Sequence, residues 1–361
     1  MKSENRIPKT EGRPAPLPTA SSEEPSVIRT TRPSSRARGS FGFRISDFGL
    51  RICPSLLGLL FWLLPIGGCA RGEVVFETTS AYHNIQVTDE NGLRTLRFDA
   101  TTQSRMNLTN PLTGHFEYTE MFHVIWLWNA KLTNVLMVGL GGASTQRAFE
   151  HDYPGLQIDT VEIDPAVRRV ATEYFQFKES PRQRVHVEDG RVFLRRSPKR
   201  FDAILMDAYT ETRYGGFIPQ HLATQEFFQL AAAHLTANGV LAYNVMGNLR
   251  GWRADLLGAM HKTLKTVFPQ VYLFPCTTSQ NVILIATKSR EKVSFSLLQQ
   301  RADFLINQDK VTLPAFRTRL NAFRAEAPPT AARAPLLTDD FAPVEGLVSG
   351  AGGSGGKGGA R

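Results

Sequence analysis

Apolar and polar residues alternate from residue 72 to residue 100, on either side of the turn sequence DENG at 89–92. An alternation with period two is typical of strands with one buried face, and Asn-Gly is a frequent hairpin turn. This stretch therefore predicts a small antiparallel β module.

Beyond this module, short apolar runs alternate with segments of helical periodicity. We expect strands at 135–138, 158–161, 184–187, 203–206 and 240–244, followed by a pair at 271–274 and 282–286. Helices are expected between them, including 165–175, with a proline in its first turn, and 224–235. This order predicts an α/β protein with a mostly parallel sheet covered by helices on both faces.

The first 71 residues have a different texture. Residues 1–51 are rich in Pro, Ser, Arg and Thr and are expected to be disordered. Residues 52–71 contain an uncharged apolar run after a basic flank, which is typical of a secretory signal, and the sequence IGGC ending at Cys69 resembles a bacterial lipobox. Three interpretations stay open: a lipoprotein signal lipidated at Cys69, an uncleaved membrane anchor, or sequence upstream of the true start. The first two predict a membrane-associated protein and the third a cytoplasmic one.

The composition excludes several classes of protein. A chain of 361 residues with 42% hydrophobic and 21% charged residues has room for two or three domains, and it is neither a disordered polymer nor a multi-span membrane protein. Three cysteines without a CxxC motif predict neither a disulfide framework nor a metal site. The net charge is +9, but residues 1–71 contribute +6, so no nucleic-acid partner is expected for the body.

Candidate ligand-binding residues follow the first two strands of the expected sheet. The sequence VLMVGLGGAST places Gly139 and Gly141 in the turn after the first strand, where a missing Cβ lets the backbone approach a ligand. Glu162 ends the second strand, 21 residues beyond Gly141. An acid at about that distance binds ribose hydroxyls in nucleotide-binding βαβ units, so the pair predicts a nucleoside site.

Two further acids follow the third and fourth strands. Asp189, before Gly190, can either accept a hydrogen bond from an adenine amino group or cap the helix expected at 191–195. Asp207 ends the apolar run FDAILMD. A carboxylate at the end of a buried strand is costly to desolvate, so Asp207 is expected to be catalytic or to bind a ligand.

Taken together, these segments resemble the polyamine aminopropyltransferases, the spermidine synthase family, which share the fold of S-adenosylmethionine-dependent methyltransferases. The resemblance runs from about residue 75 to 288 through SAYHNIQV, EYTEM, VLMVGLGGAS, VEIDP, VEDGRVFL, FDAILMDAY, FIPQHLATQEFF and NGVLAYNV, and LLTDDFAPVE follows near the end. It implies a Rossmann-like seven-stranded sheet, a homodimer, and transfer of the aminopropyl group of decarboxylated S-adenosylmethionine to an amine such as putrescine, with release of methylthioadenosine. The donor is a co-substrate, so no tightly bound cofactor is expected.

The resemblance also implies roles for individual residues. Asp207 matches the catalytic aspartate, which acts as the base, and Tyr82 and Tyr118 match positions in the substrate pocket. The positions that bind the nucleoside donor are matched here by Gly139, Gly141, Glu162, Asp189, Gly190 and Gln103.

The sequence departs from the family pattern at two places that recognise the amine. Thr210 stands where a second aspartate is usual, and Gly114 and His115 stand where an Asp-Glu pair is usual. We expect Glu211 and Glu117 to take over from these missing carboxylates.

Two other functions remain open at this stage. Methyl transfer from S-adenosylmethionine uses the same nucleoside half of the site, and a membrane-tethered protein could bind a nucleoside or polyamine without turnover. The expected organisation is a disordered segment (1–51), a signal or anchor (52–71), a small β domain (72–115), a Rossmann-like catalytic domain (116–290), a helical extension (291–347) and a flexible glycine-rich tail (348–361).

Overall fold

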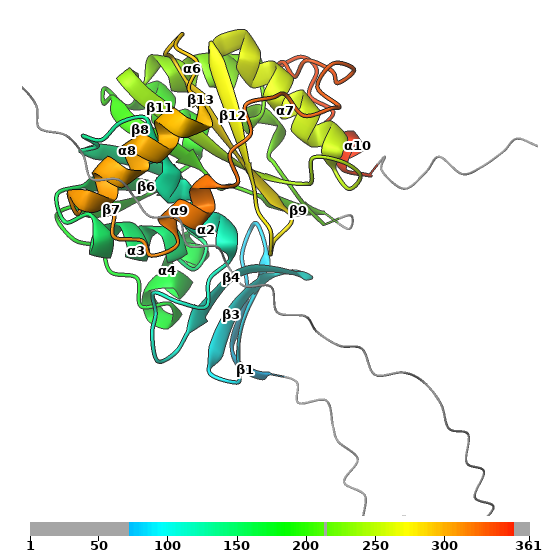
Figure 1. Ribbon diagram of the computed structural model, residues 1–361. Coiled ribbons are helices and arrows are strands. Elements are labelled where there is room, and N and C mark those ends of the chain that lie inside the picture. Colours follow the sequence, from blue (N-terminus) through cyan, green and yellow to red (C-terminus); the bar gives the residue numbers. More distant parts are fainter. Residues whose placement is uncertain (1–71, 213–214, 350–361) are drawn as a thin grey trace, which may run out of the picture. The chain divides into compact units, whose positions relative to one another are not determined.

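The computed structural model describes residues 72–212 and 215–349, all within the compact unit Gly67–Arg361 (Figure 1). The expected disordered segment and the apolar segment at 52–71, with Cys69, lie outside the described residues. Within the described ranges, no helix combines the length and the apolar character needed to cross a bilayer. The structure contains a single chain, so the homodimer stays a prediction.

A four-stranded antiparallel sheet forms the N-terminal part of the described chain. Its strands are β1 (Glu73–Thr79), β2 (Asn84–Glu90), β3 (Leu93–Phe98) and β4 (Thr101–Asn107), in that spatial order. Alternate residues such as Ile85, Val87 and Leu96 are fully buried and share a core with Val167 and Val170, which lie after the second strand of the larger sheet. The period-two pattern therefore predicted the module, and the structure shows which face of it is buried.

The larger sheet has seven strands, and all seven of the expected strands are present. They are β5 (Asn134–Val138), β6 (Gln157–Glu162), β7 (Gln183–Val187), β8 (Phe201–Met206), β11 (Leu235–Met246), β12 (Gln270–Pro275) and β13 (Asn281–Thr287). Their spatial order is β12-β13-β11-β8-β5-β6-β7, parallel from β7 to β11, with β13 antiparallel to both of its neighbours. This is the Rossmann-like sheet of the methyltransferase type, as expected.

Helices cover both faces of this sheet (Figure 1). The helical elements are α2 (Glu117–Met121), η1 (Phe122–Leu127), α3 (Ser144–Asp152), α4 (Pro165–Tyr174), α5 (Gly190–Arg196), η2 (Gln220–Leu222), α6 (Gln225–Ala233), α7 (Ala254–Val267), α8 (Phe295–Asn307), α9 (Phe316–Leu320) and α10 (Val344–Ser349). Leu136 and Val138 of β5 pack with α5, α6 and α7, whereas Val135 and Met137 pack with η1, α3 and α8. The central strands are therefore apolar on both faces, which explains their continuous hydrophobic runs.

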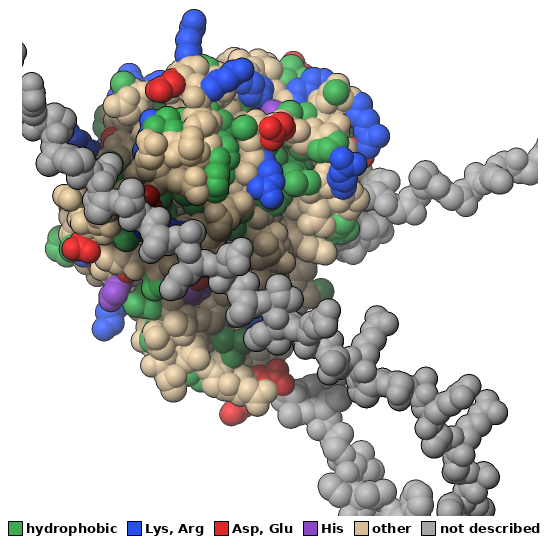
Figure 2. All heavy atoms as spheres, in the orientation of Figure 1, with side chains coloured by type: hydrophobic (Ala, Val, Ile, Leu, Met, Phe, Trp, Pro, Cys, Tyr) green, Lys and Arg blue, Asp and Glu red, His purple; other side chains and the backbone are tan. Residues whose placement is uncertain are grey.

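Charged side chains do not form one large basic area on the face shown in Figure 2. Lys and Arg side chains over the helices there are interspersed with acidic and hydrophobic side chains. Lys199, which lies just after α5, pairs with Asp159 at 2.7 Å.

The C-terminal segment returns to the helices that flank the sheet. Asp339 accepts two hydrogen bonds from the guanidinium of Arg191, at 2.7 and 2.6 Å, and one from the hydroxyl of Thr224 at 2.7 Å. The backbone N–H of Gln225 donates to the carbonyl of Leu337 at 2.8 Å. The segment LLTDDFAPVE is therefore hydrogen-bonded to the N-terminal ends of α5 and α6.

Replacing Asp339 with alanine tests this attachment. Arg191 is buried, so removing Asp339 leaves its charge without the carboxylate partner, and we expect the free energy of unfolding to fall by about 1–3 kcal/mol. Urea denaturation measures the change. The neighbouring Asp340, which is exposed, is the control, because Asp340→Ala should stay within about 0.5 kcal/mol of wild type. Equal changes in the free energy of unfolding for the two substitutions would show that the pairing with Arg191 does not stabilise the fold.

Candidate active site

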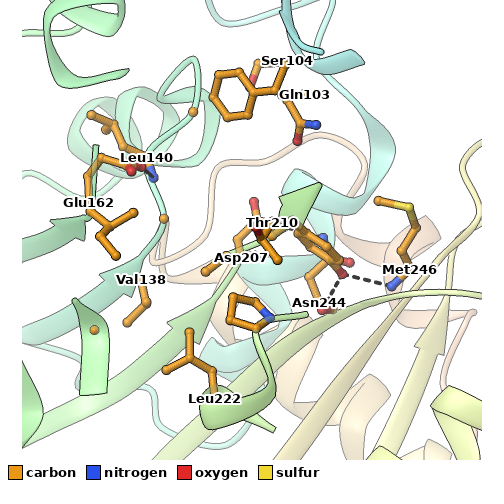
Figure 3. A pocket seen from close by; sticks show the side chains of 18 of the residues that line it. Gln103, Ser104, Val138, Leu140, Glu162, Asp207, Thr210, Leu222, Asn244 and Met246 are labelled. Carbon is orange, nitrogen blue, oxygen red and sulfur yellow. Dashed lines mark hydrogen bonds between the residues drawn. The ribbon is translucent and has the colours of Figure 1, made fainter. Parts of the chain in front are cut away.

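A cavity of about 550 Å³ lies at the carboxyl ends of β5, β6, β8 and β11, and residues of the four-stranded sheet complete its wall (Figure 3). This volume is in the range of pockets that enclose small molecules. The predicted residues that line it are Gly139, Gly141, Glu162, Asp189, Gly190, Asp207, Gln103, Tyr118 and Tyr82. The fold therefore brings nine residues from seven separate segments of the sequence to one cavity.

The turn after β5 requires glycine at its first position. Gly139 has φ of +102°, and a Cβ added there would lie 2.2 Å from the carbonyl oxygen of Asp207. The surrounding backbone is fixed by two hydrogen bonds of 2.8 Å, from Gly139 N–H to the carbonyl of Val161 and from Asp207 N–H to the carbonyl of Val138. The ends of β5, β6 and β8 therefore meet where no side chain fits.

Glu162 is fixed at the end of β6 by backbone donors. Its Oε2 accepts from the N–H of Leu140 at 2.9 Å, and its Oε1 accepts from the N–H of Asp164 at 3.0 Å. Burial raises the pKa of Glu162 above its usual value. A carboxylate has about four acceptor sites, so the group, which lines the cavity, can still accept a hydrogen bond from a hydroxyl of a ligand.

Asp189 has the capping role that was one of its two expected roles, and it also lines the cavity. Its Oδ1 accepts from the N–H groups of Arg191 and Val192, both at 2.9 Å, at the start of α5. Its Oδ2 lies 2.7 Å from Nε2 of His221, a residue that the sequence did not indicate. Burial raises the pKa of Asp189, but the hydrogen bonds from His221 and from the helix lower it more, so the pKa is below its usual value.

Asp207 lies half-buried at the end of β8, and two side chains donate hydrogen bonds to its carboxylate. Asn244 Nδ2 donates to Asp207 Oδ1 at 2.8 Å, and Asn281 Nδ2 donates to Asn244 Oδ1 at 3.0 Å. The hydroxyl of Tyr118, from α2, also donates to Asp207. Burial raises the pKa of Asp207 to about 6, and the bonds from Asn244 and Tyr118 limit that rise.

The two asparagines were not predicted as site residues, although the sequence carries a signal for them. Asn244 is a polar residue in the apolar run VLAYNV, and Asn281 precedes the apolar run VILIA. Both are buried, and a buried amide needs hydrogen-bond partners. The partner could not be identified from the sequence, because Asp207 lies 37 residues before Asn244.

Glu211 lies near the cavity but does not line it. It sits on β9 (Thr210–Thr212), which forms a hairpin with β10 (Gly215–Phe217) that the sequence did not predict. Its Oε1 accepts from Gln103 Nε2 at 2.9 Å and from the hydroxyl of Thr101. Burial, followed by the charge of Asp99, raises the pKa of Glu211 to about 7. Glu211 therefore reaches the cavity only through Gln103.

Glu117 does not reach the cavity, contrary to the expectation that it replaces a missing carboxylate. It accepts hydrogen bonds from the N–H groups of Thr277 and Thr278, at 2.8 and 2.5 Å, and pairs with Arg319 at 2.6 Å. Successive residues of a helix point about 100° apart, so Glu117 and Tyr118 cannot both face the cavity. Tyr118 faces it, and Glu117 joins α2 to α9 and to the loop before β13.

The positions of the missing Asp-Glu pair have a structural role in this chain. Gly114 has φ of +81°, and a Cβ there would lie 2.8 Å from the backbone nitrogen of Asn107. His115 Nε2 lies 3.1 Å from a carboxylate oxygen of Glu120. Neither position lines the cavity, whereas Thr210, in place of the second aspartate, does. Among the described residues, no cluster of three or more His, Cys, Asp or Glu side chains could hold a metal ion.

The fold and the cavity define a Rossmann-like protein of the methyltransferase type with a small-molecule pocket at its strand ends, and sequence comparison identifies its family. The spermine/spermidine synthase domain matches residues 115–296. The polyamine aminopropyltransferase of Vibrio vulnificus is 30% identical over 300 residues, which cover 80% of this chain and 96% of that protein. The chain belongs to the spermine/spermidine synthase family, and the resemblance noted in the sequence is confirmed.

Other relatives are similar over a smaller part of their length or share the fold. The eEF1A lysine and N-terminal methyltransferase of Xenopus laevis is 32% identical over 171 residues, 45% of this chain and 24% of that protein. A probable spermidine synthase from Corynebacterium glutamicum superposes with a TM-score of 0.54 at 20% identity, over 63% of this chain and 86% of that structure. Spermidine synthase from Thermotoga maritima gives a TM-score of 0.52 at 20% identity, over 69% and 88%. At this identity, the two structures establish a common fold.

Replacing Gly139 with alanine tests the requirement for glycine. The added Cβ must push the end of β5 away from β8, so we expect a loss of about 1–3 kcal/mol in the free energy of unfolding together with weaker binding of methylthioadenosine. Denaturation and titration calorimetry measure the two effects. Gly155→Ala is the control, since no atom lies within 4 Å of a Cβ added there. Wild-type stability and binding in Gly139→Ala would contradict the geometry described.

Replacing Asn244 with alanine tests the support of Asp207. The hydrogen bond from Asn244 stabilises the ionised carboxylate, so its loss should raise the pKa of Asp207 further above about 6. The carboxyl-carbon NMR signal of Asp207, followed as a function of pH, measures this pKa. Asn281→Ala leaves the direct bond in place and should give a smaller change in the same direction. A pKa that is unchanged or lower in Asn244→Ala would show that the amide does not support the charge.

Proposed function

We propose that the protein transfers the aminopropyl group of decarboxylated S-adenosylmethionine to a primary amine and releases methylthioadenosine, with Asp207 as the proton acceptor. The observation that carries the proposal is a half-buried carboxylate, with a pKa raised to about 6, in the same cavity as a glycine turn and Glu162. Membership of the spermine/spermidine synthase family supports it.

The nucleoside of the donor is assigned to the half of the cavity between β5 and β7. Glu162 would accept hydrogen bonds from the ribose hydroxyls, and the turn at Gly139 and Gly141 leaves room for the ligand beside the backbone. The second oxygen of Asp189, shared with His221, and the adjoining Gly190 would contact the adenine. This placement directs the sulfonium toward Asp207.

The chemistry needs a base because the attacking amine is protonated at neutral pH. Asp207 takes one proton from the ammonium, and the freed nitrogen lone pair attacks the methylene carbon next to the sulfonium. The carbon–sulfur bond breaks, and its electron pair neutralises the sulfur, which leaves methylthioadenosine as a thioether. Alignment of two bound reactants supplies much of the rate in such displacements.

The raised pKa of Asp207 reduces the cost of the proton transfer. Each pKa unit corresponds to about 1.36 kcal/mol, so a shift from 3.8 to about 6 makes Asp207 a stronger base by about 3 kcal/mol. The carboxylate is still ionised at pH 7, because this pH lies above its pKa. Activity should therefore increase with pH through about 6.

The walls around Asp207 would hold the two reactants in line. Tyr118 donates to Asp207 and lines the cavity, and Gln103 and Tyr82 line it from the four-stranded sheet. These residues are assigned to the donor tail and the acceptor.

A donor panel tests the proposal against the other functions. The purified protein is incubated with decarboxylated S-adenosylmethionine or with S-adenosylmethionine and a set of amines, and the products are separated by chromatography with mass detection. We expect methylthioadenosine from the first donor, with Asp207→Asn lowering kcat/KM by about 10²–10⁴. Asp202→Asn is the control, because Asp202 lies at the opposite end of β8, where it binds Thr133.

Two results would reject the proposal. Release of S-adenosylhomocysteine from S-adenosylmethionine, without methylthioadenosine from the decarboxylated donor, would identify a methyltransferase. No product from either donor, with tight nucleoside binding, would identify a binding protein without turnover.

A further inference from the structure

The cavity continues past Asp207, on the side away from Glu162, into what we name the acceptor end. It is lined by Thr210, Met246, Trp252 and the loop residues 278–280. In Figure 3, Met246 lies on the far side of Asp207 from Glu162 and Leu140. The N–H of Gly247, next to Met246, donates to the carbonyl of Gln280 at 2.8 Å, so the loop adjoins the end of β11.

We infer that the acceptor end selects a primary amine whose far end is uncharged, and disfavours a diamine. This inference rests on the proposed function and names the acceptor class for the same site. A diamine such as putrescine carries one ammonium at the reacting end and a second at the far end. The second charge needs a carboxylate or an aromatic face when it leaves water.

The described residues of the acceptor end carry no such carboxylate. The acids that line the cavity are Glu162, Glu188 and Asp189 around the nucleoside half, and Asp207 at the centre. Asp207 is assigned to the reacting nitrogen. The residues of the acceptor end are hydroxyls, an amide, a thioether and an indole, which are all neutral.

A buried cation lies directly behind this wall. Arg253 is 4% exposed, and its Nη1 donates to the carbonyl of Gly216 at 2.6 Å and lies 3.3 Å from the sulfur of Met246. Its Cζ is 4.5 Å from the centre of the Trp252 ring. Arg253 forms no salt bridge within the described part of the chain. A second ammonium at the acceptor end would therefore meet a like charge across a thin apolar wall, where solvent screens weakly.

Arg253 also weakens the second way of binding the far ammonium, which is contact with the aromatic face of Trp252. An indole can replace a carboxylate by binding an ammonium over its face. One face of Trp252 is already occupied by the guanidinium of Arg253, so its electrostatic attraction for another cation is partly used.

The two acids that were expected to replace the missing carboxylates, Glu211 and Glu117, do not supply a negative charge at the acceptor end. Glu211 is outside the lining, is bonded to Gln103, and has a pKa of about 7, so it is about half protonated at neutral pH. Its charge acts on Arg253 from beyond ion-pair distance. Glu117 is paired with Arg319 and faces away. The wall that remains, with Met246 and Trp252, suits an alkyl tail.

Comparing n-butylamine with putrescine tests the inference, because the two differ only by the second amino group. With decarboxylated S-adenosylmethionine at pH 7, we expect kcat/KM for n-butylamine to exceed that for putrescine at least about tenfold, the ratio produced by about 1.4 kcal/mol. A value for putrescine equal to or above that for n-butylamine overturns the inference.

Two variants test the assigned cause. Thr210→Asp adds a carboxylate to the wall and Arg253→Met removes the buried cation, so both should shift the ratio toward putrescine. The exposed Arg250, in the same loop, is the control, and Arg250→Met should keep the wild-type ratio. If Arg253→Met does not fold, Thr210→Asp decides alone. An unchanged ratio in a folded Thr210→Asp protein overturns the electrostatic explanation.

Failure of the proposed function would be recognised separately. If neither amine gives methylthioadenosine, aminopropyl transfer is refuted, and calorimetry with the full chain saturated with methylthioadenosine then compares binding of the two amines. Tighter binding of n-butylamine supports an uncharged far end. Tighter binding of putrescine, or no binding of either, overturns it.

Discussion

The site depends on the close approach of two backbones at the ends of β5 and β8. Gly139 lies against the carbonyl of Asp207, at a separation that leaves no room for a Cβ. The next residue, Leu140, donates its N–H to Glu162. One turn therefore sets the positions of two carboxylates that line the cavity, on β6 and β8, the strands on either side of β5. A displacement of this turn would therefore move both Glu162 and Asp207.

The carboxylates that line the cavity are stabilised in different ways, and their pKa values differ for that reason. Asp189 has a helix N-terminus and His221 as partners, so its pKa is lowered. Asp207 has two neutral donors, Asn244 and Tyr118, which only partly offset its burial. A neutral relay fixes the orientation of a base without removing its basicity, whereas an ion pair would make the base weaker. Asn281 supports this arrangement because its amide donates a hydrogen bond to Asn244. Both asparagines are buried.

The sequence predicted the features that depend on local pattern. The seven strands followed from apolar runs, and the nucleoside half of the site followed from glycines and acids at strand ends, which topology brings together. It did not predict His221, Asn281 or Arg253, because each acts through a partner distant in the chain. The placement of Glu117 failed for a different reason, since a one-residue step along a helix changes the face that a side chain occupies. The attachment of Asp339 to Arg191 spans 148 residues and has no local signal.

The two halves of the cavity relate differently to the family pattern. In the proposed assignment, the nucleoside half contains Glu162 and Asp189, while the amine half has Thr210 in place of a carboxylate and the buried Arg253 behind Met246 and Trp252. The proposed function places the carboxylate of Asp207 against the sulfur of the donor, between these two halves. A crystal structure with methylthioadenosine tests this most directly. The account predicts ribose hydroxyls on Glu162 and the thioether sulfur on the side of Asp207. A nucleoside bound elsewhere, or with its sulfur directed away from Asp207, would contradict it.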